Sequence, residues 1–214
     1  MDDQKVFVTA IAVDTQNKVY AAYSSCMIKV FSCVPLRNNV GVATSGTFHL
    51  GKDSHSFHLS QEINLLGGPL ELDSNPIENK ILSLLISQDC KKLFVSSGKI
   101  IFMFLSSTST SSNGTKRGKS LFLPVAQFPF HTSLISGMEL YAERFLVVTA
   151  QDMWVSLWSI STTDNVPLLT SYLHSPGFSL AILTDLDELV DGGKKSWSEN
   201  TQITAAVAVG TAAG

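Results

Sequence analysis

Short apolar segments rich in β-branched residues alternate along this chain with clusters of polar turn residues. The clearest case is residues 145–159, where an apolar segment leads through a polar turn carrying Asp152 into a second segment that closes on Trp158. Segments of this kind, separated by tight turns, are typical of antiparallel β-strands. Because little of the chain has a convincing helical period, the pattern predicts an all-β protein.

The same order of strands and turns occurs three times and begins a fourth time. Each unit has a first strand, a polar turn, a second strand, a tight turn and a third strand. The fourth unit has a long polar turn, 185–200, between its two strands. The predicted strands are residues 6–13, 18–23 and 26–32 in the first unit, 80–86, 91–96 and 99–105 in the second, 134–140, 144–150 and 153–160 in the third, and 178–183 and 203–209 in the fourth.

A fourth strand is expected after each complete unit. Residues 120–127 and 166–173 fill that place after the second and third units. After the first unit it is either 56–63 or 42–50. Four antiparallel strands joined by short hairpins form one blade of a β-propeller. We therefore expect one propeller region over residues 1–214, with blades at about 6–65, 80–128 and 133–173 and a partial blade at about 177–214.

Residues 149–158 resemble a repeat of the WD40 family of β-propellers. An aspartate in the turn, Asp152, precedes an alternating strand that closes on a tryptophan, Trp158. The resemblance covers most of the chain, but its motifs are degenerate. The closing pair in the third unit is Trp-Ser rather than Trp-Asp, and the first and second units close on Phe31 and Phe104.

The resemblance implies a structural blade motif made of Asp152, Trp154 and Trp158. Asp152 is expected to brace its turn by accepting backbone N–H groups, and the two tryptophans are expected to share one face and to be buried against neighbouring blades. The family's Gly-His signature is echoed only by His131 and His174. A complete hydrogen-bonded Asp-His-Ser-Trp network is therefore not expected in any blade.

The repeat count predicts an incomplete propeller of about three and a half blades, whereas closed propellers use about four to eight. The last predicted strand is the second of its unit and would leave an apolar edge. We expect a fragment or short isoform of a longer propeller. A partner that supplies the missing blades, or a four-bladed ring closed by the N-terminal strand, are the alternatives.

Composition indicates a globular intracellular protein. Hydrophobic residues make up 44% and charged residues 15%, and the formal net charge of −3 weakens a dedicated nucleic-acid-binding role. Cys26, Cys33 and Cys90 form no CxxC pair, and the acidic start does not resemble a signal peptide. No apolar run is long enough to span a membrane. The expected location is the nucleus or cytoplasm, without secretion or membrane attachment.

The sequence carries no convincing catalytic or metal-binding pattern. His55 and His58, near His49 and Asp53, lack the ligand framework of a zinc site, and the acidic run 185–191 does not match a calcium loop. No G-x-S-x-G motif anchors a hydrolase triad. We expect no catalytic residues, no metal, no cofactor and no small-molecule substrate.

A basic patch of Lys116, Arg117 and Lys119 lies in a Ser/Thr-rich loop, 106–119. This patch is a candidate partner-binding loop, and a solubilising loop is the alternative reading.

The family resemblance implies a non-catalytic scaffold that binds other protein subunits in an intracellular complex. Nuclear assemblies of the ribosome-biogenesis or tRNA-modification type are the analogy, which rests on fold alone. The first alternative is a subunit that contacts RNA through the basic loop. The second is a propeller enzyme with a central-channel site, but the first strands begin with Val6, Lys80, Leu134 and Phe178 and offer no convergent acid pair.

Overall fold

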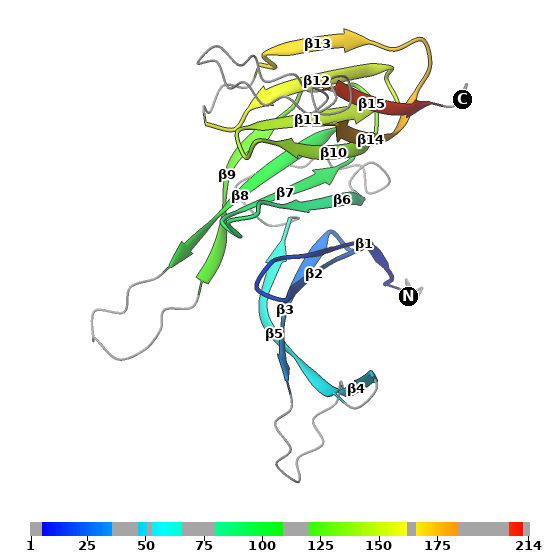
Figure 1. The fold of residues 1–214 in the computed structure, drawn as a ribbon. Helices are drawn as coiled ribbons and strands as arrows, with labels where there is room; N and C mark the ends of the chain where they lie inside the picture. The colour runs from blue at the N-terminus through cyan, green and yellow to red at the C-terminus, as the bar shows by residue number, and fades with distance from the viewer. Residues whose placement is uncertain are drawn as a thin grey trace, which may run out of the picture. The chain divides into compact units, whose positions relative to one another are not determined.

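The chain forms β-sheets joined by turns (Figure 1). A computed structural model describes residues 6–35, 47–50, 53–65, 80–108, 120–161, 166–183 and 206–211. Within those residues there are fifteen strands and no helix, so the all-β prediction is confirmed. The chain divides into two compact units, Met1–Pro129 and Phe130–Gly214.

Unit 1, Met1–Pro129, contains two antiparallel sheets. We call the first sheet blade one; its strands pair in the order β1-β2-β3-β5-β4. We call the second sheet blade two; its strands pair in sequence order, β6-β7-β8-β9. The strands are β1 Val8–Val13, β2 Lys18–Tyr23, β3 Met27–Pro35, β4 Thr47–Leu50, β5 Asp53–Asn64, β6 Ile81–Ile86, β7 Lys92–Ser97, β8 Ile100–Thr108 and β9 Ser120–Phe128.

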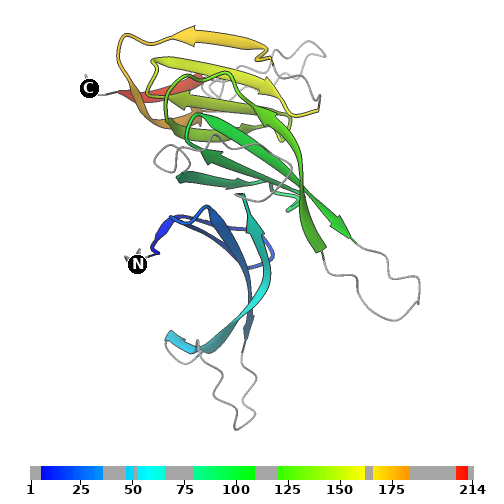
Figure 2. The same cartoon turned by 180° about the vertical axis from the view of Figure 1, so that it is seen from behind.

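Unit 2, Phe130–Gly214, contains the other two sheets, which Figure 2 shows from behind. Blade three pairs its strands in the order β10-β11-β12-β13, and blade four is the two-stranded sheet β14-β15. The strands are β10 Ile135–Tyr141, β11 Phe145–Ala150, β12 Trp154–Ser159, β13 Leu169–Tyr172, β14 Gly177–Leu183 and β15 Ala206–Thr211.

The strand order settles the alternative left open for blade one. β5, which spans the predicted 56–63, pairs with β3 and is the fourth strand of the sheet. β4 overlaps the other candidate, 42–50, but pairs with β5 and adds a fifth strand at the edge. The predicted turn 185–200 lies outside the described residues. That the whole chain forms one propeller region stays a prediction.

The core of unit 1 lies between blades one and two. Alternation along β2 and β3 places Tyr20, Ala22, Ile28 and Val30 on one face of blade one, and all four are buried. They belong to one apolar cluster with residues of β6, β7 and β8, including Leu84, Leu93, Val95, Phe102 and Phe104. Burial of this apolar surface is the main force that holds the two sheets together.

Polar contacts fix how blades one and two pack. The side-chain amide of Gln61 on β5 accepts a hydrogen bond from the backbone N–H of Phe122 on β9 at 3.1 Å and donates one to its carbonyl oxygen at 3.4 Å. The ring of Phe122 meets Tyr20 edge-on, with centroids 5.8 Å apart. Thr15 also donates to the carbonyl of Gln88 at 3.3 Å. These contacts add directional constraints to an otherwise apolar interface.

In unit 2, blade four packs closely on blade three. A Cβ atom on Gly137 of β10 would lie 3.0 Å from the Cβ of Leu180 on β14. A Cβ atom on Gly177 would collide with the hydroxyl of Thr149 on β11. Both positions therefore require glycine because the strands approach too closely for a side chain.

Candidate functional site

The turn between β11 and β12 is built around the carboxylate of Asp152. Its Oδ1 accepts the backbone N–H of Trp154 at 3.1 Å, and its Oδ2 accepts the backbone N–H of Thr132 at 2.8 Å. Met153 adopts a left-handed φ of 67°, which lets the chain reverse. Asp152 thus joins the turn to the segment that precedes β10.

A chain of hydrogen bonds extends from this carboxylate into the core. The imidazole Nδ1 of His131 lies 3.1 Å from Asp152 Oδ2, and its Nε2 lies 2.8 Å from the hydroxyl of Ser156. The indole Nε1–H of Trp158 donates to the same hydroxyl at 2.8 Å. The Asp-His-Ser-Trp network is therefore complete in blade three, and the expectation that no blade would form it was wrong.

The sequence missed this network because its histidine has no Gly-His signature. His131 follows Phe130 and lies 21 residues before Asp152, so only the fold brings the two together. The signal that could have found it was a histidine shortly before the first strand of the one unit that also closes on tryptophan.

His131 is neutral in this network. Burial lowers the pKa of His131, although Asp152 nearby favours the protonated form. The hydrogen-bond pattern agrees, because Nε2 must accept the Ser156 O–H if that hydroxyl oxygen is to accept from Trp158. The proton of the imidazole therefore sits on Nδ1 and is donated to Asp152. The contact between His131 and Asp152 is a hydrogen bond with one charged partner rather than an ion pair.

The order Ser-His-Asp resembles the hydrogen-bonded arrangement of a hydrolase triad, but burial makes this serine inaccessible. Ser156 is 0% exposed and His131 is 3% exposed. The Ser156 oxygen that would attack a substrate is occupied by the indole N–H of Trp158. A nucleophile needs a substrate carbonyl within about 3 Å, and no substrate reaches a fully buried oxygen. These groups are suited to bracing the blade.

The two tryptophans of the predicted motif differ in exposure. Trp158 is fully buried, but Trp154 is 36% exposed, so the expectation that both would be buried was wrong for Trp154. The difference follows from position, because Trp158 sits in the sheet interior and Trp154 stands at the start of β12 beside the turn.

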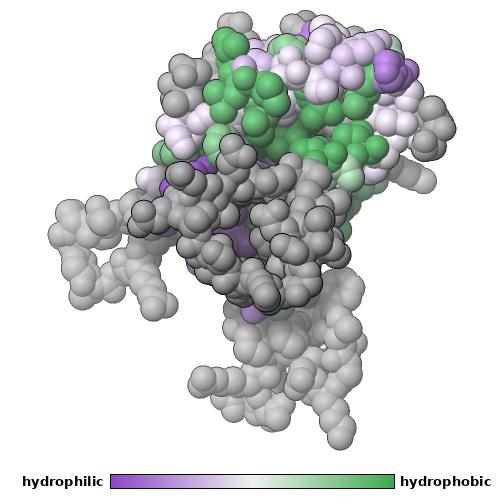
Figure 3. Space-filling model, turned by 45° about the horizontal axis from the view of Figure 1, so that its top comes forward, coloured by the Kyte–Doolittle hydropathy of each residue, from purple (hydrophilic) through white to green (hydrophobic). Residues whose placement is uncertain are grey.

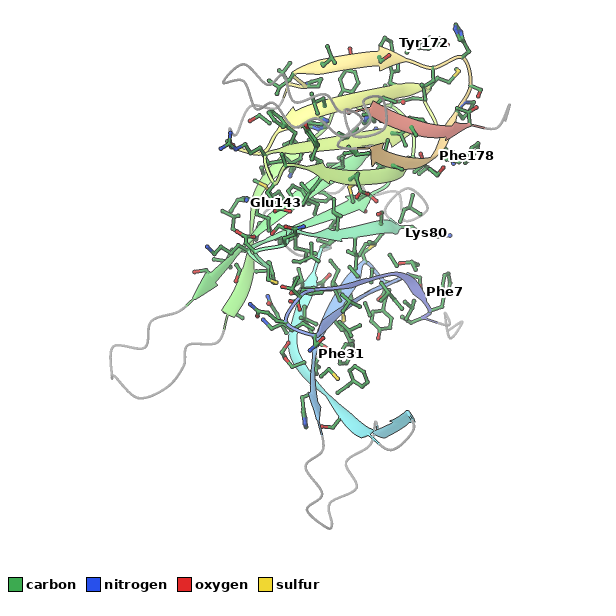
Figure 4. All side chains as sticks on the ribbon, viewed as in Figure 1. Phe7, Phe31, Lys80, Glu143, Tyr172 and Phe178 are labelled. Carbon is green, nitrogen blue, oxygen red and sulfur yellow. The ribbon has the colours of Figure 1, made fainter. Side chains whose placement is uncertain are left out.

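Trp154 belongs to an exposed group of rings, which we call the aromatic cluster: Phe130, Trp154, Tyr172 and His174. Trp154 meets Tyr172 edge-on with centroids 5.3 Å apart and Phe130 at 6.3 Å, and Tyr172 meets His174 at 6.4 Å. Phe130 also contacts the buried Trp158 at 6.2 Å. Tyr172, labelled in Figure 4, is 52% exposed on the edge strand β13. The cluster is therefore anchored to the core at one end and open to solvent at the other.

Blade one is braced by a different carboxylate. Asp14, in the turn between β1 and β2, accepts the backbone N–H groups of Gln16 and Lys18, each at 2.8 Å, and the hydroxyl of Tyr20 at 3.0 Å. Burial, and then the charge of Asp14, raise the pKa of Tyr20 well above its usual range. The sequence did not single out this pair, although an aspartate directly after a strand and a tyrosine on the next strand was a usable signal.

Blade two uses a smaller version of the same device. Ser87 donates to Asp89 Oδ1 at 2.6 Å, and that oxygen accepts the backbone N–H of Lys91 at 3.0 Å. The hydrogen bond from Ser87 is the main reason that the pKa of Asp89 is lowered.

Other predicted positions fall partly or wholly outside the described residues. Lys116, Arg117 and Lys119 lie there, as does the acidic run 185–191, and nothing can be read of the side chains of His49, Asp53 and His55. His58 contacts the hydroxyl of Ser56 at 3.0 Å. Among the residues whose side chains are described, no three His, Cys, Asp or Glu groups gather as a metal site. No helix in the described ranges is long and apolar enough to cross a membrane.

Comparison with known proteins identifies the fold. The sequence matches no protein-family model and no curated protein sequence. Two solved structures are similar over 83% of the chain, each with a TM-score of 0.53 and 18% identity: the structure of U3-55K and the crystal structure of RRP9 WD40 repeats. The chain spans less than half of each, 43% and 42% respectively.

These likenesses agree with the antiparallel sheets in sequence order and with the Asp-His-Ser-Trp network of blade three. The chain therefore has the fold of part of a WD40-type β-propeller.

Proposed function

We propose that this protein is a non-catalytic scaffold subunit of an intracellular multiprotein complex and that it binds a protein partner through the aromatic cluster. The observation that carries the proposal is the position of Trp154 and Tyr172. Both rings are exposed, and both are held next to a turn that buried hydrogen bonds fix in place.

The chemistry of this cluster suits protein recognition. Tyrosine and tryptophan bury a large area on binding, lose few rotatable bonds and are enriched among residues that dominate interface energies. Tyr172 also donates to the sulfur of Met153 at 3.5 Å, which restricts its ring before a partner arrives. A preformed surface loses less conformational entropy on association.

The test is partner capture with variants of the cluster. The tagged full chain would be cross-linked in cells, its reproducible protein partners identified by mass spectrometry, and the affinity for the strongest one measured with purified proteins. Trp154→Ala and Tyr172→Ala should each weaken that affinity by about tenfold or more, which corresponds to about 1.4 kcal/mol. Leu123→Ala is the matched control, because Leu123 is 51% exposed on blade two and away from the cluster. Equal affinity for all three variants would refute the aromatic cluster as the binding surface.

The finer assignment is a nuclear complex of the ribosome-biogenesis or tRNA-modification type, proposed by analogy with other WD proteins. Its test is the location of the tagged full chain and the identity of its cross-linked partners. Exclusively cytoplasmic partners would contradict it.

RNA contact is the second candidate, favoured by the basic residues Lys116, Arg117 and Lys119 between β8 and β9. Binding to phosphates by these side chains would weaken steeply as salt rises. Filter retention of labelled RNA should then fall when all three are changed to alanine. Retention that does not change would rule out this patch.

A further inference from the structure

Blade one exposes one whole face of its sheet. Residues Ile11 and Val13 of β1 are 64% and 59% exposed, and Leu59 of β5 is 49% exposed. The strand register places all three on the same side, because Val13 faces Val19, Val19 faces Phe31 and Phe31 faces Leu59, while Ile11 lies two residues along β1. We call this side the open face of blade one. Phe31 is labelled in Figure 4.

Matched positions in the other complete blades are buried. Ile11 pairs with Ala21 of the second strand, and the corresponding first-strand residues are Leu84 in blade two and Met138 in blade three. Leu84 is 8% exposed and Met138 is 7% exposed, against 64% for Ile11. A large apolar side chain at this position is therefore used for packing in two blades and left in solvent in blade one.

The two sheet-to-sheet contacts seen inside the units follow one rule of size. In unit 1, Ala10 and Ala12 on the first strand of blade one pack in the same cluster as Leu84 and Ile86 of blade two. In unit 2, Gly137 on the first strand of blade three meets Leu180 of blade four. A small-residue face on one sheet thus receives a large-residue face on the next, which lets the backbones approach closely.

Blade four exposes the small-residue half of this pair. Ser179 and Ala181 alternate with Leu180 along β14 and so lie on its opposite side, where they pair with Gly210 and Ala208 of β15. All four are exposed. We call this side the open face of blade four. Unit 2 exposes apolar surface in the view of Figure 3.

We propose that the open face of blade one binds the open face of blade four in a second copy of this chain. Large residues Ile11, Val13 and Leu59 of one copy then pack on Ala181, Ala208 and their neighbours in the other, as blade two packs on blade one within unit 1. Two copies present two such contacts related by a twofold axis, which gives a closed dimer. This inference does not depend on the proposed scaffold function.

The test is the mass of the full chain in solution, measured by sedimentation velocity over a range of concentrations. Wild-type protein should rise from the 23.1 kDa of one chain towards twice that mass. Ile11→Glu and Ala181→Glu should each weaken association roughly a hundredfold, because each buries an unpaired charge in an apolar contact. Leu123→Glu, an exposed position on neither face, should associate like the wild type.

Mixing the two variants separates this arrangement from others. Ile11→Glu keeps an intact blade-four face and Ala181→Glu keeps an intact blade-one face, so an equimolar mixture should form a mixed dimer through one contact. Circular dichroism and Trp158 fluorescence check that each variant is folded. A wild-type chain that stays at one-chain mass at every concentration would overturn the proposal. So would an Ala181→Glu variant that associates like the wild type, because that result would point to a contact between two blade-one faces.

Discussion

Blade one and blade three have the same strand order but are held by different polar groups. In blade three the bracing carboxylate, Asp152, lies in the turn between the second and third strands and connects through His131 and Ser156 to Trp158. In blade one the bracing carboxylate, Asp14, lies in the turn between the first and second strands and binds Tyr20 directly.

Register makes the comparison position by position. Trp158 pairs with Leu146, and in blade one the equivalent pair is Phe31 with Val19. Two residues earlier, Ser156 in blade three corresponds to Lys29 in blade one, whose ammonium pairs with Glu62 at 3.1 Å. The blade fold therefore requires a satisfied buried carboxylate at a turn, but it does not require a particular turn or a particular partner.

The largest expected effect comes from the residues that close the third strand. Trp158→Ala should destabilise the protein by about 3–5 kcal/mol, because it leaves a cavity and an unpaired Ser156. Phe31→Ala should cost less, since Phe31 is only partly buried. Chemical denaturation of both variants measures the difference. Equal losses would break the comparison.

The next effect separates the two turns between the second and third strands. Asp152→Ala should cost about 1–3 kcal/mol, because it leaves the buried His131 and two backbone N–H groups without their acceptor. Ser25→Ala, the matched position in blade one, should change stability by less than about 0.5 kcal/mol because Ser25 is exposed. A cost for Ser25→Ala as large as for Asp152→Ala would show that the brace in blade one had been misplaced.

A smaller effect tests the blade-one brace itself. Tyr20→Phe keeps the ring and removes the hydroxyl that binds Asp14, so it should cost about 1 kcal/mol. The variant Tyr23→Phe on the same strand is the control, since Tyr23 is only partly buried. Denaturation midpoints that do not differ between the two would remove Tyr20 from the network.

The smallest effect is the pH dependence that His131 contributes. Because the folded state lowers its pKa, the unfolded chain binds a proton more readily, and this contribution to stability is complete above the ordinary pKa of about 6.5 and is lost as pH falls. Stability should fall between about pH 7 and pH 5, and His131→Gln should flatten that slope. An identical slope in the variant would show that other groups cause it.

The sequence predicted the fold better than the site. Strands such as Lys18–Tyr23 were predicted to the residue, because β-branched runs bounded by polar turns are local signals. The Asp152-to-Trp158 spacing was also visible because both residues lie in one hairpin. His131 joins them from outside that hairpin, and Gln61 reaches Phe122 across 61 residues, so only tertiary packing reveals those contacts. The exposure of Trp154 could not be read from alternation, because alternation assigns a face but not what covers it.

The most direct test of a structural role for the blade-three network is hydrogen exchange in Ser156→Ala. Ser156 is the hub that His131 and Trp158 share, so its loss leaves two buried groups unpaired. Peptides covering residues 130–160 should lose amide protection, while peptides covering 6–35 should keep it. Unchanged protection over 130–160, or an equal loss over 6–35, would contradict the account.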